Sequence, residues 1–201
     1  EQMLRAEDAL IELRQKMSML AMEFAKGRLN QAQFDAIYQH YSEQRNITER
    51  LLARDPQSQA WQSVIHPGHT MFLRNHYAAH ALSYAIYDLR TFKLITLTGG
   101  VQLETRMVEA ALRRLQTIFT TRGNPGPAQR KLQDGRCVMF VPGEFAVAVI
   151  IYSLEPSAVQ QRRVKDIHSD FERANQQVLK SQGYTRDRLV FPHRALFEDN
   201  K

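Results

Sequence analysis

The chain has 201 residues, of which 43% are hydrophobic and 24% charged, so it can bury a core as one domain with an appendage or as two small units. No apolar run reaches the roughly 20 residues that a membrane-spanning helix needs, and the acidic N-terminus lacks the apolar stretch of a signal peptide. The single cysteine, Cys137, excludes an internal disulfide, and we expect a cytoplasmic protein.

The formal net charge of +6 is distributed unevenly. Residues 1–60 carry 8 basic and 9 acidic side chains, a net charge of −1, whereas residues 61–201 carry 19 and 12, a net charge of +7. The positive second part would favour an acidic protein, a nucleic acid or an anionic surface as a partner.

The N-terminal segment, residues 1–55, is predicted to form a helical hairpin. Apolar residues recur at helical spacing over 2–25 and again over 31–54. Gly27 between the two stretches suits the end of a helix, and Asn30 suits the N-cap of the next one. The pattern therefore predicts an N-terminal αα-hairpin that could serve as a coiled-coil or oligomerisation element.

Residues 72–182 are predicted to form one α/β domain of the α+β type, after a linker over 56–71. The expected elements are a short helix at 72–81, strands at 83–89 and 93–98, a helix at 102–120, strands at 129–133, 137–141 and 145–152, and a helix at 159–178. The order β-β-α-β-β-β-α predicts a five-stranded antiparallel sheet with its helices on one face. Residues 183–201 are predicted to be an irregular tail.

The second half of this domain resembles a known group of folds. The sequence GRCVMFVPGEFAVAVII of residues 135–151 forms a predicted hairpin, and Glu155-Pro156 and an amphipathic helix follow it. This arrangement is similar to roadblock/longin/profilin-like domains, and the short helix at 72–81 is closer to longin-like members than to roadblock proper. The resemblance implies dimerisation through a sheet edge or helix face and association with a small GTPase or a signalling partner.

A second resemblance covers residues 20–51. Leu20, Phe24, Gly27-Arg28-Leu29 and Phe34 stand at the spacing of the short C-terminal helical-hairpin motif found in many bacterial proteins. The role implied by this motif is oligomerisation or contact with a partner.

Four of the seven histidines lie close together, and they are the sharpest candidates for chemistry: His66, His69, His76 and His80. On one helix His76 and His80 would share a face, as zinc ligands do. However, no His-Glu-x-x-His motif and no cysteine pair accompanies them, so we expect no metal and no cofactor. Neither a nucleophile elbow nor paired carboxylates stand in the apolar strands. We therefore expect no catalytic residue and no enzyme.

The candidate interaction residues are two arginine pairs, Arg113 with Arg114 and Arg162 with Arg163. Both pairs fall on the solvent faces of their predicted helices, where they could build a basic patch. No aromatic RNA-binding signature and no helix-turn-helix pattern accompanies them.

These observations predict a non-catalytic protein-interaction or regulatory module that self-associates as a homo-oligomer and binds a signalling or small-GTPase partner. One alternative is a ligand-sensing domain with a pocket between sheet and helix. The other is binding of nucleic acid or an anionic surface through the basic second half.

Overall fold

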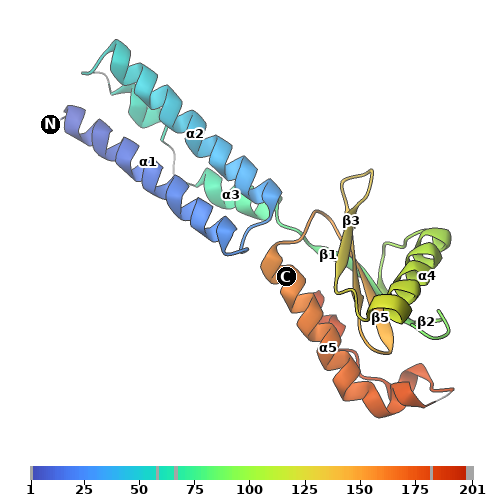
Figure 1. The fold of residues 1–201 in the computed structure, drawn as a ribbon. Helices are drawn as coiled ribbons and strands as arrows, with labels where there is room; N and C mark the ends of the chain where they lie inside the picture. The colour runs from blue at the N-terminus through green and yellow to red at the C-terminus, as the bar shows by residue number, and fades with distance from the viewer. Residues whose placement is uncertain (1, 58, 66–67, 182, 198–201) are drawn as a thin grey trace. The chain divides into compact units, whose positions relative to one another are not determined.

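The computed structural model describes residues 2–57, 59–65, 68–181 and 183–197, and for residues 2–6 the backbone alone. The chain divides into two compact units, Glu1–Ala78 and Ala79–Lys201. Their elements are labelled in Figure 1. Within the described ranges, no helix has the length and apolar character required to cross a membrane.

The first unit is the predicted helical hairpin with a third helix added. It contains α1 (Gln2–Ala25), α2 (Gln31–Arg54), the short 3₁₀ helix η1 (Ala60–Ser63) and α3 (His69–His76). Gly27 adopts a φ of 72° after α1, where the Arg28 N–H donates to the Glu23 carbonyl at 3.0 Å. Asn30 then caps α2 in a reciprocal capping box with Gln33. Local sequence therefore determines the turn.

The core of this unit gathers the residues that carry the resemblance to the short helical-hairpin motif. Leu20, Leu29 and Ile37 are buried together, and the rings of Phe24 and Phe34 stack with their centroids 4.6 Å apart. The predicted spacing thus produces a packed hairpin.

The predicted linker and domain start are wrong, because segment 56–78 is attached to the hairpin. The side chain of Gln44 donates to the Val64 carbonyl at 2.9 Å. Arg74 of α3 forms an ion pair with Glu23 of α1 at 2.7 Å, and the Gln33 side chain donates to the Arg74 carbonyl at 2.7 Å. Polar side chains of the hairpin thus bind two backbone carbonyls of this segment, which a linker would leave to water.

The second unit contains the predicted five-stranded antiparallel sheet. The strands are β1 (Ala81–Asp88), β2 (Leu94–Gly99), β3 (Ala128–Lys131), β4 (Cys137–Pro142) and β5 (Ala146–Tyr152), in the spatial order β2-β1-β5-β4-β3. Helix α4 (Thr105–Arg122) connects β2 to β3, and α5 (Ala158–Lys180) follows β5. The predicted fold class and element order are confirmed.

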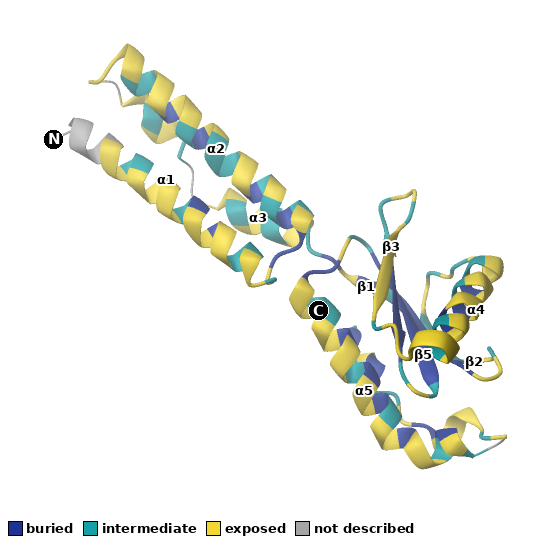
Figure 2. Cartoon of the chain, viewed as in Figure 1, coloured by how far each residue is buried: buried dark blue, intermediate teal, exposed yellow. Residues whose placement is uncertain are grey.

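The helices cover both faces of the sheet, whereas the sequence predicted one face. Val138 and Val149 of the sheet pack with α4 residues, and Met139 and Ile150, their alternating neighbours, pack with Phe171 of α5. The two helices lie on opposite sides of the sheet in Figure 1. This arrangement explains why β5 is an almost uninterrupted apolar run that is buried along its whole length, as Figure 2 shows.

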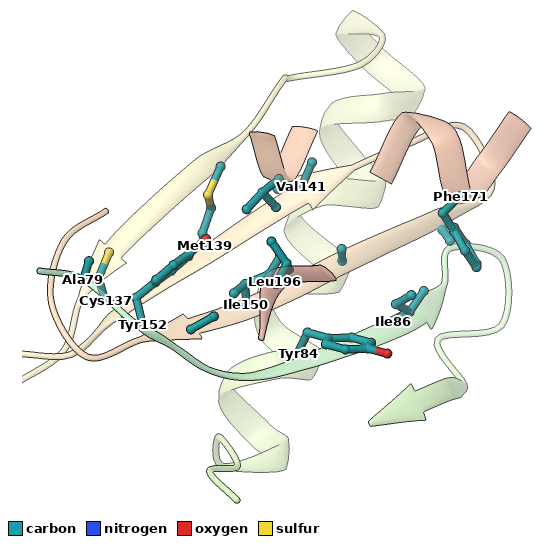
Figure 3. Close-up of a cluster of buried hydrophobic side chains, with 14 of the residues drawn as sticks. Ala79, Tyr84, Ile86, Cys137, Met139, Val141, Ile150, Tyr152, Phe171 and Leu196 are labelled. Carbon is teal, nitrogen blue, oxygen red and sulfur yellow. The ribbon is translucent and has the colours of Figure 1, made fainter. Parts of the chain in front are cut away.

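The α5 face holds the larger core cluster. Figure 3 shows side chains from the central strands, α5 and the C-terminal segment meeting there. Leu189 and Leu196 belong to this cluster, so the tail that was predicted to be irregular is folded instead. It contains two 3₁₀ helices, η2 (Arg186–Arg188) and η3 (Pro192–Leu196). The Asn175 side chain of α5 fixes the tail by bonding both the N–H and the carbonyl of Val190.

The turn between β4 and β5 is held by a carboxylate of α5. Glu172 accepts from the backbone N–H groups of Glu144, Phe145 and Ala146 at 2.7, 2.8 and 2.9 Å. A Cβ atom at Gly143 would lie 2.2 Å from this carboxylate, so the glycine is required for the close approach. The Pro-Gly-Glu turn is therefore a docking point for α5 as well as a chain reversal.

Candidate protein-interaction site

Helix α4 covers only the middle of its face of the sheet, and it leaves a groove beside β3. The α4 residues buried against the sheet, Val108, Leu112 and Leu115, are spaced four and three residues apart, so they share one face of the helix. Between α4 and strands β3 and β4 lies a hollow of about 670 Å³.

 The lining of this hollow is mainly apolar and includes Met107, Ala111, Ile118, Ala128, Val138 and Phe140. We call this hollow the α4–β3 groove.

Strand β3 forms one wall of the groove and is an edge strand of the sheet, with β2 at the opposite edge. All four of its residues are exposed, as Figure 2 shows. The Leu132 N–H donates to the Arg136 carbonyl of the neighbouring chain segment at 2.8 Å. Because antiparallel ladders alternate, the N–H and C=O groups of Gln129 and Lys131 point outward. The edge therefore offers unpaired backbone groups beside an apolar hollow.

Positive charge lies on two walls of the groove. Arg114 of α4 and Arg130 of β3 line it, and Arg113 and Lys131 are exposed next to them in the sequence. The pair Arg113 and Arg114, which the sequence singled out, thus lies on the helix that forms the groove.

The other arginine pair belongs elsewhere. Arg162 and Arg163 are exposed on α5, which covers the opposite face of the sheet. The four arginines therefore do not form one basic patch. A continuous nucleic-acid surface cannot be built from these two pairs, because they lie on helices that cover opposite faces of the sheet.

The histidine cluster is divided by the fold. His66 lies outside the described residues. His69 and His76 belong to α3 in the first unit, and His80 belongs to the second. The ring of Phe72 lies between those of His69 and His76, with centroids 5.5 and 5.4 Å away. Among the described residues, no group of three or more potential ligands could hold a metal ion.

A different histidine pair, which the sequence reasoning missed, is buried beneath the tail. His168 of α5 lies 3.1 Å from the Ala146 carbonyl through Nε2 and 3.3 Å from His193 Nε2 through Nδ1. A carbonyl can only accept, so His168 Nε2 carries a hydrogen, and in the neutral ring Nδ1 accepts from His193. His193 Nδ1 is then an acceptor, and it is buried without a hydrogen-bond partner.

Burial explains why this pair stays neutral. Desolvation and the neighbouring His168 lower the pKa of His193 to about 3, and desolvation also lowers the pKa of His168. No substrate-sized cavity among those described is lined by either ring. The pair therefore joins the tail to α5.

Cys137 is buried in β4. Burial raises the pKa of its thiol, with a smaller contribution from Glu155. Such a thiol is a poor nucleophile at neutral pH.

A smaller hollow of about 280 Å³ lies on the other side of α4, toward β1 and β2. Ser83 and Ala85 of the sheet and Leu103 and Val108 beside or on α4 are among its lining residues. Its volume is at the lower limit of small-molecule pockets. It therefore gives the ligand-sensing alternative weaker support than the α4–β3 groove gives to protein binding.

The groove itself was not predicted, although the sequence carries a signal for it. Ala110-Ala111 on α4 and Gly126 and Ala128 beside or on β3 line the hollow with small side chains. Small residues on two facing elements leave space where larger ones would close it. No protein-family model matches the chain, and no curated protein is detectably similar to it in sequence.

Proposed function

We propose that this chain is a non-catalytic protein-interaction module that self-associates through the outer edge of β3 and the adjoining α4–β3 groove. The observation that carries the proposal is the combination of an exposed edge strand with an apolar hollow along it. Pairing of two edges would satisfy the outward backbone groups, and the groove would receive apolar side chains of the second copy.

Charge selects one register for such a dimer. An antiparallel pair of identical edges must place one residue opposite its own copy. A ladder forms only in registers where outward-pointing residues such as Gln129 and Lys131 face outward-pointing residues of the second copy. Centring the pair on Arg130 would oppose two like charges, whereas centring it on Gln129 places Arg130 opposite Ala128. We therefore propose the register centred on Gln129.

The Gln129→Pro variant tests the edge directly. Proline removes an N–H that points outward and is not used by β4, so it blocks edge pairing while the sheet keeps its own hydrogen bonds. We expect light scattering at about 100 µM to give a dimer for the unmodified chain and a monomer for Gln129→Pro. Gln129→Ala, which keeps the N–H, should remain dimeric. A monomeric unmodified chain would refute the proposal.

A disulfide tests the register. In the Gln129→Cys variant, the two Cα atoms opposite one another in the dimer would lie within the 4.4–6.8 Å range of disulfides. We expect rapid oxidative cross-linking of this variant and slow cross-linking of Lys131→Cys. The native thiol of Cys137 is buried and does not compete.

The cationic walls of the groove also support an acidic protein partner, for which the longin-like resemblance suggests a signalling protein or a small GTPase. Arg114 and Arg130 would pair with its carboxylates. Salt distinguishes the two occupants: it should weaken binding of an acidic partner, and it should strengthen self-association by screening the like charges of two copies.

A further inference from the structure

A third cavity, of about 570 Å³, lies where the β1–β2 loop meets the segment after α5. It shares no lining residue with the α4–β3 groove. Asp88, Arg90, Lys93, Leu94, Tyr184 and Arg186 are among its lining residues. Three of these side chains are cationic, and among the described lining residues Asp88 alone is acidic.

Asp88 holds the walls of this cavity together. Its Oδ1 accepts from the backbone N–H groups of Arg90 and Thr91 at 2.8 and 2.9 Å, and its Oδ2 accepts from the Tyr184 hydroxyl at 2.7 Å. Burial by itself would raise the pKa of Asp88, but these hydrogen bonds outweigh it and hold the pKa below its ordinary value. The carboxylate is therefore ionised, and both of its oxygens accept hydrogen bonds from the cavity wall.

Arg90 neutralises that carboxylate. Its guanidinium lies 3.6 Å from Asp88 Oδ2 and donates to the Leu179 carbonyl at the end of α5 at 3.0 Å. The loop is fixed from the other side by Phe92, which has a φ of 57° and packs against the core cluster of the α4 face. A bulky residue in this conformation is strained, so surrounding contacts must maintain the loop shape.

Lys93 and Arg186 then supply the uncompensated charge of the cavity. Both side chains are exposed, and the Arg186 guanidinium lies 5.9 Å from the centroid of the Phe191 ring. Leu94 adds an apolar surface that is 50% exposed. A pre-shaped cavity with two available cations and one apolar wall matches a molecule that has an anionic group and an apolar part.

We propose that this cavity binds a small organic anion, whose phosphate or carboxylate group pairs with Lys93 and Arg186 and whose apolar part packs on Leu94. The anionic group would gain charge-assisted hydrogen bonds from both cations. Because the β1–β2 loop is already held in place, binding would require little ordering of the protein.

The experiment is a titration of the full chain with phenyl phosphate, benzoate, inorganic phosphate and phenol, followed by the backbone amide signals of Thr91, Lys93 and Leu94. We expect saturable shifts with phenyl phosphate or benzoate, weaker binding of inorganic phosphate, and none with phenol. The stronger of the first two probes identifies the anionic group. Absence of saturable shifts with both organic anions would overturn the proposal.

Charge-matched variants locate the site. Lys93→Gln and Arg186→Gln should each weaken binding of the better probe about tenfold, because each removes one charge-assisted hydrogen bond. Arg162→Gln removes the same charge from an exposed position of α5 and should leave the affinity unchanged. Equal weakening by all three variants would show a general charge effect and would also overturn the proposal. Unchanged oligomeric state in these variants keeps the result separate from that of the β3 edge.

Discussion

The two faces of the sheet differ in how completely their helices cover them. On the α5 face, the helix, the β4–β5 turn and the C-terminal segment are tied together by Glu172, Asn175 and the His168–His193 pair. On the α4 face, the helix packs along its middle and leaves hollows of about 280 and 670 Å³ at its sides. The comparison indicates that hydrogen bonds between distant segments concentrate on the α5 face, whereas the hollow proposed to receive a second copy of the chain lies on the α4 face.

The largest expected effect comes from truncating the core of the α5 face. Phe171 is completely buried, so Phe171→Ala should lower the free energy of unfolding by about 4 kcal/mol. Leu115→Ala on the α4 face should lower it by only about 2 kcal/mol, because Leu115 borders the open groove. Urea denaturation of both variants measures this difference. Equal losses would remove the distinction between the faces.

The carboxylate at the β4–β5 turn should have the next largest effect. Glu172→Ala leaves three backbone N–H groups without their acceptor, and we expect a loss of about 2 kcal/mol because the site is only partly buried. Asp166→Ala, an exposed change on the same helix, should cost less than about 0.5 kcal/mol. If the two variants unfold at the same urea concentration, the carboxylate does not hold the turn.

Acid should destabilise the α5 face through His193. Its folded pKa of about 3 lies below the ordinary value of 6.5, so the unfolded chain binds the proton more tightly. The stability is present above pH 6.5 and is lost as the pH falls toward 3. Between pH 7 and pH 5 we expect a loss of about 2 kcal/mol from this residue.

The His193→Phe variant is the control for this pH dependence. It removes the titrating ring while filling the same buried position, so its urea midpoint should fall less between pH 7 and pH 5 than that of the unmodified chain. A pH dependence that His193→Phe leaves intact would assign the acid effect to other groups.

Much of the fold could be predicted because its signals are local. Neighbouring residues alone produce three of these signals: the glycine and asparagine between α1 and α2, the apolar period of α4 and the apolar run at β5. Each predicted element is present. The errors concern contacts between distant segments. Segment 56–78 has a turn-rich sequence, but Gln33 and Gln44 of α2 donate to two of its backbone carbonyls. The tail is similarly fixed by Asn175.

The candidate sites were less predictable than the fold. Arg113 and Arg114 were found by their exposure on a helix, but the groove beside them depends on how far α4 lies from β3. The cavity at Asp88 brings together the β1–β2 loop and residues 183–186, which are about ninety positions apart in the chain. No periodicity in the sequence connects them.

The sequence by itself determined the helices, the strands and their order, because hydrophobic period, caps and turn residues act over a few positions. The tertiary structure alone decided that the helices cover opposite faces, that the tail is locked by two neutral histidines, and that hollows remain beside α4 and at the β1–β2 loop. These features depend on side chains that meet from remote segments, where packing, burial and hydrogen-bond partners are set by the whole fold.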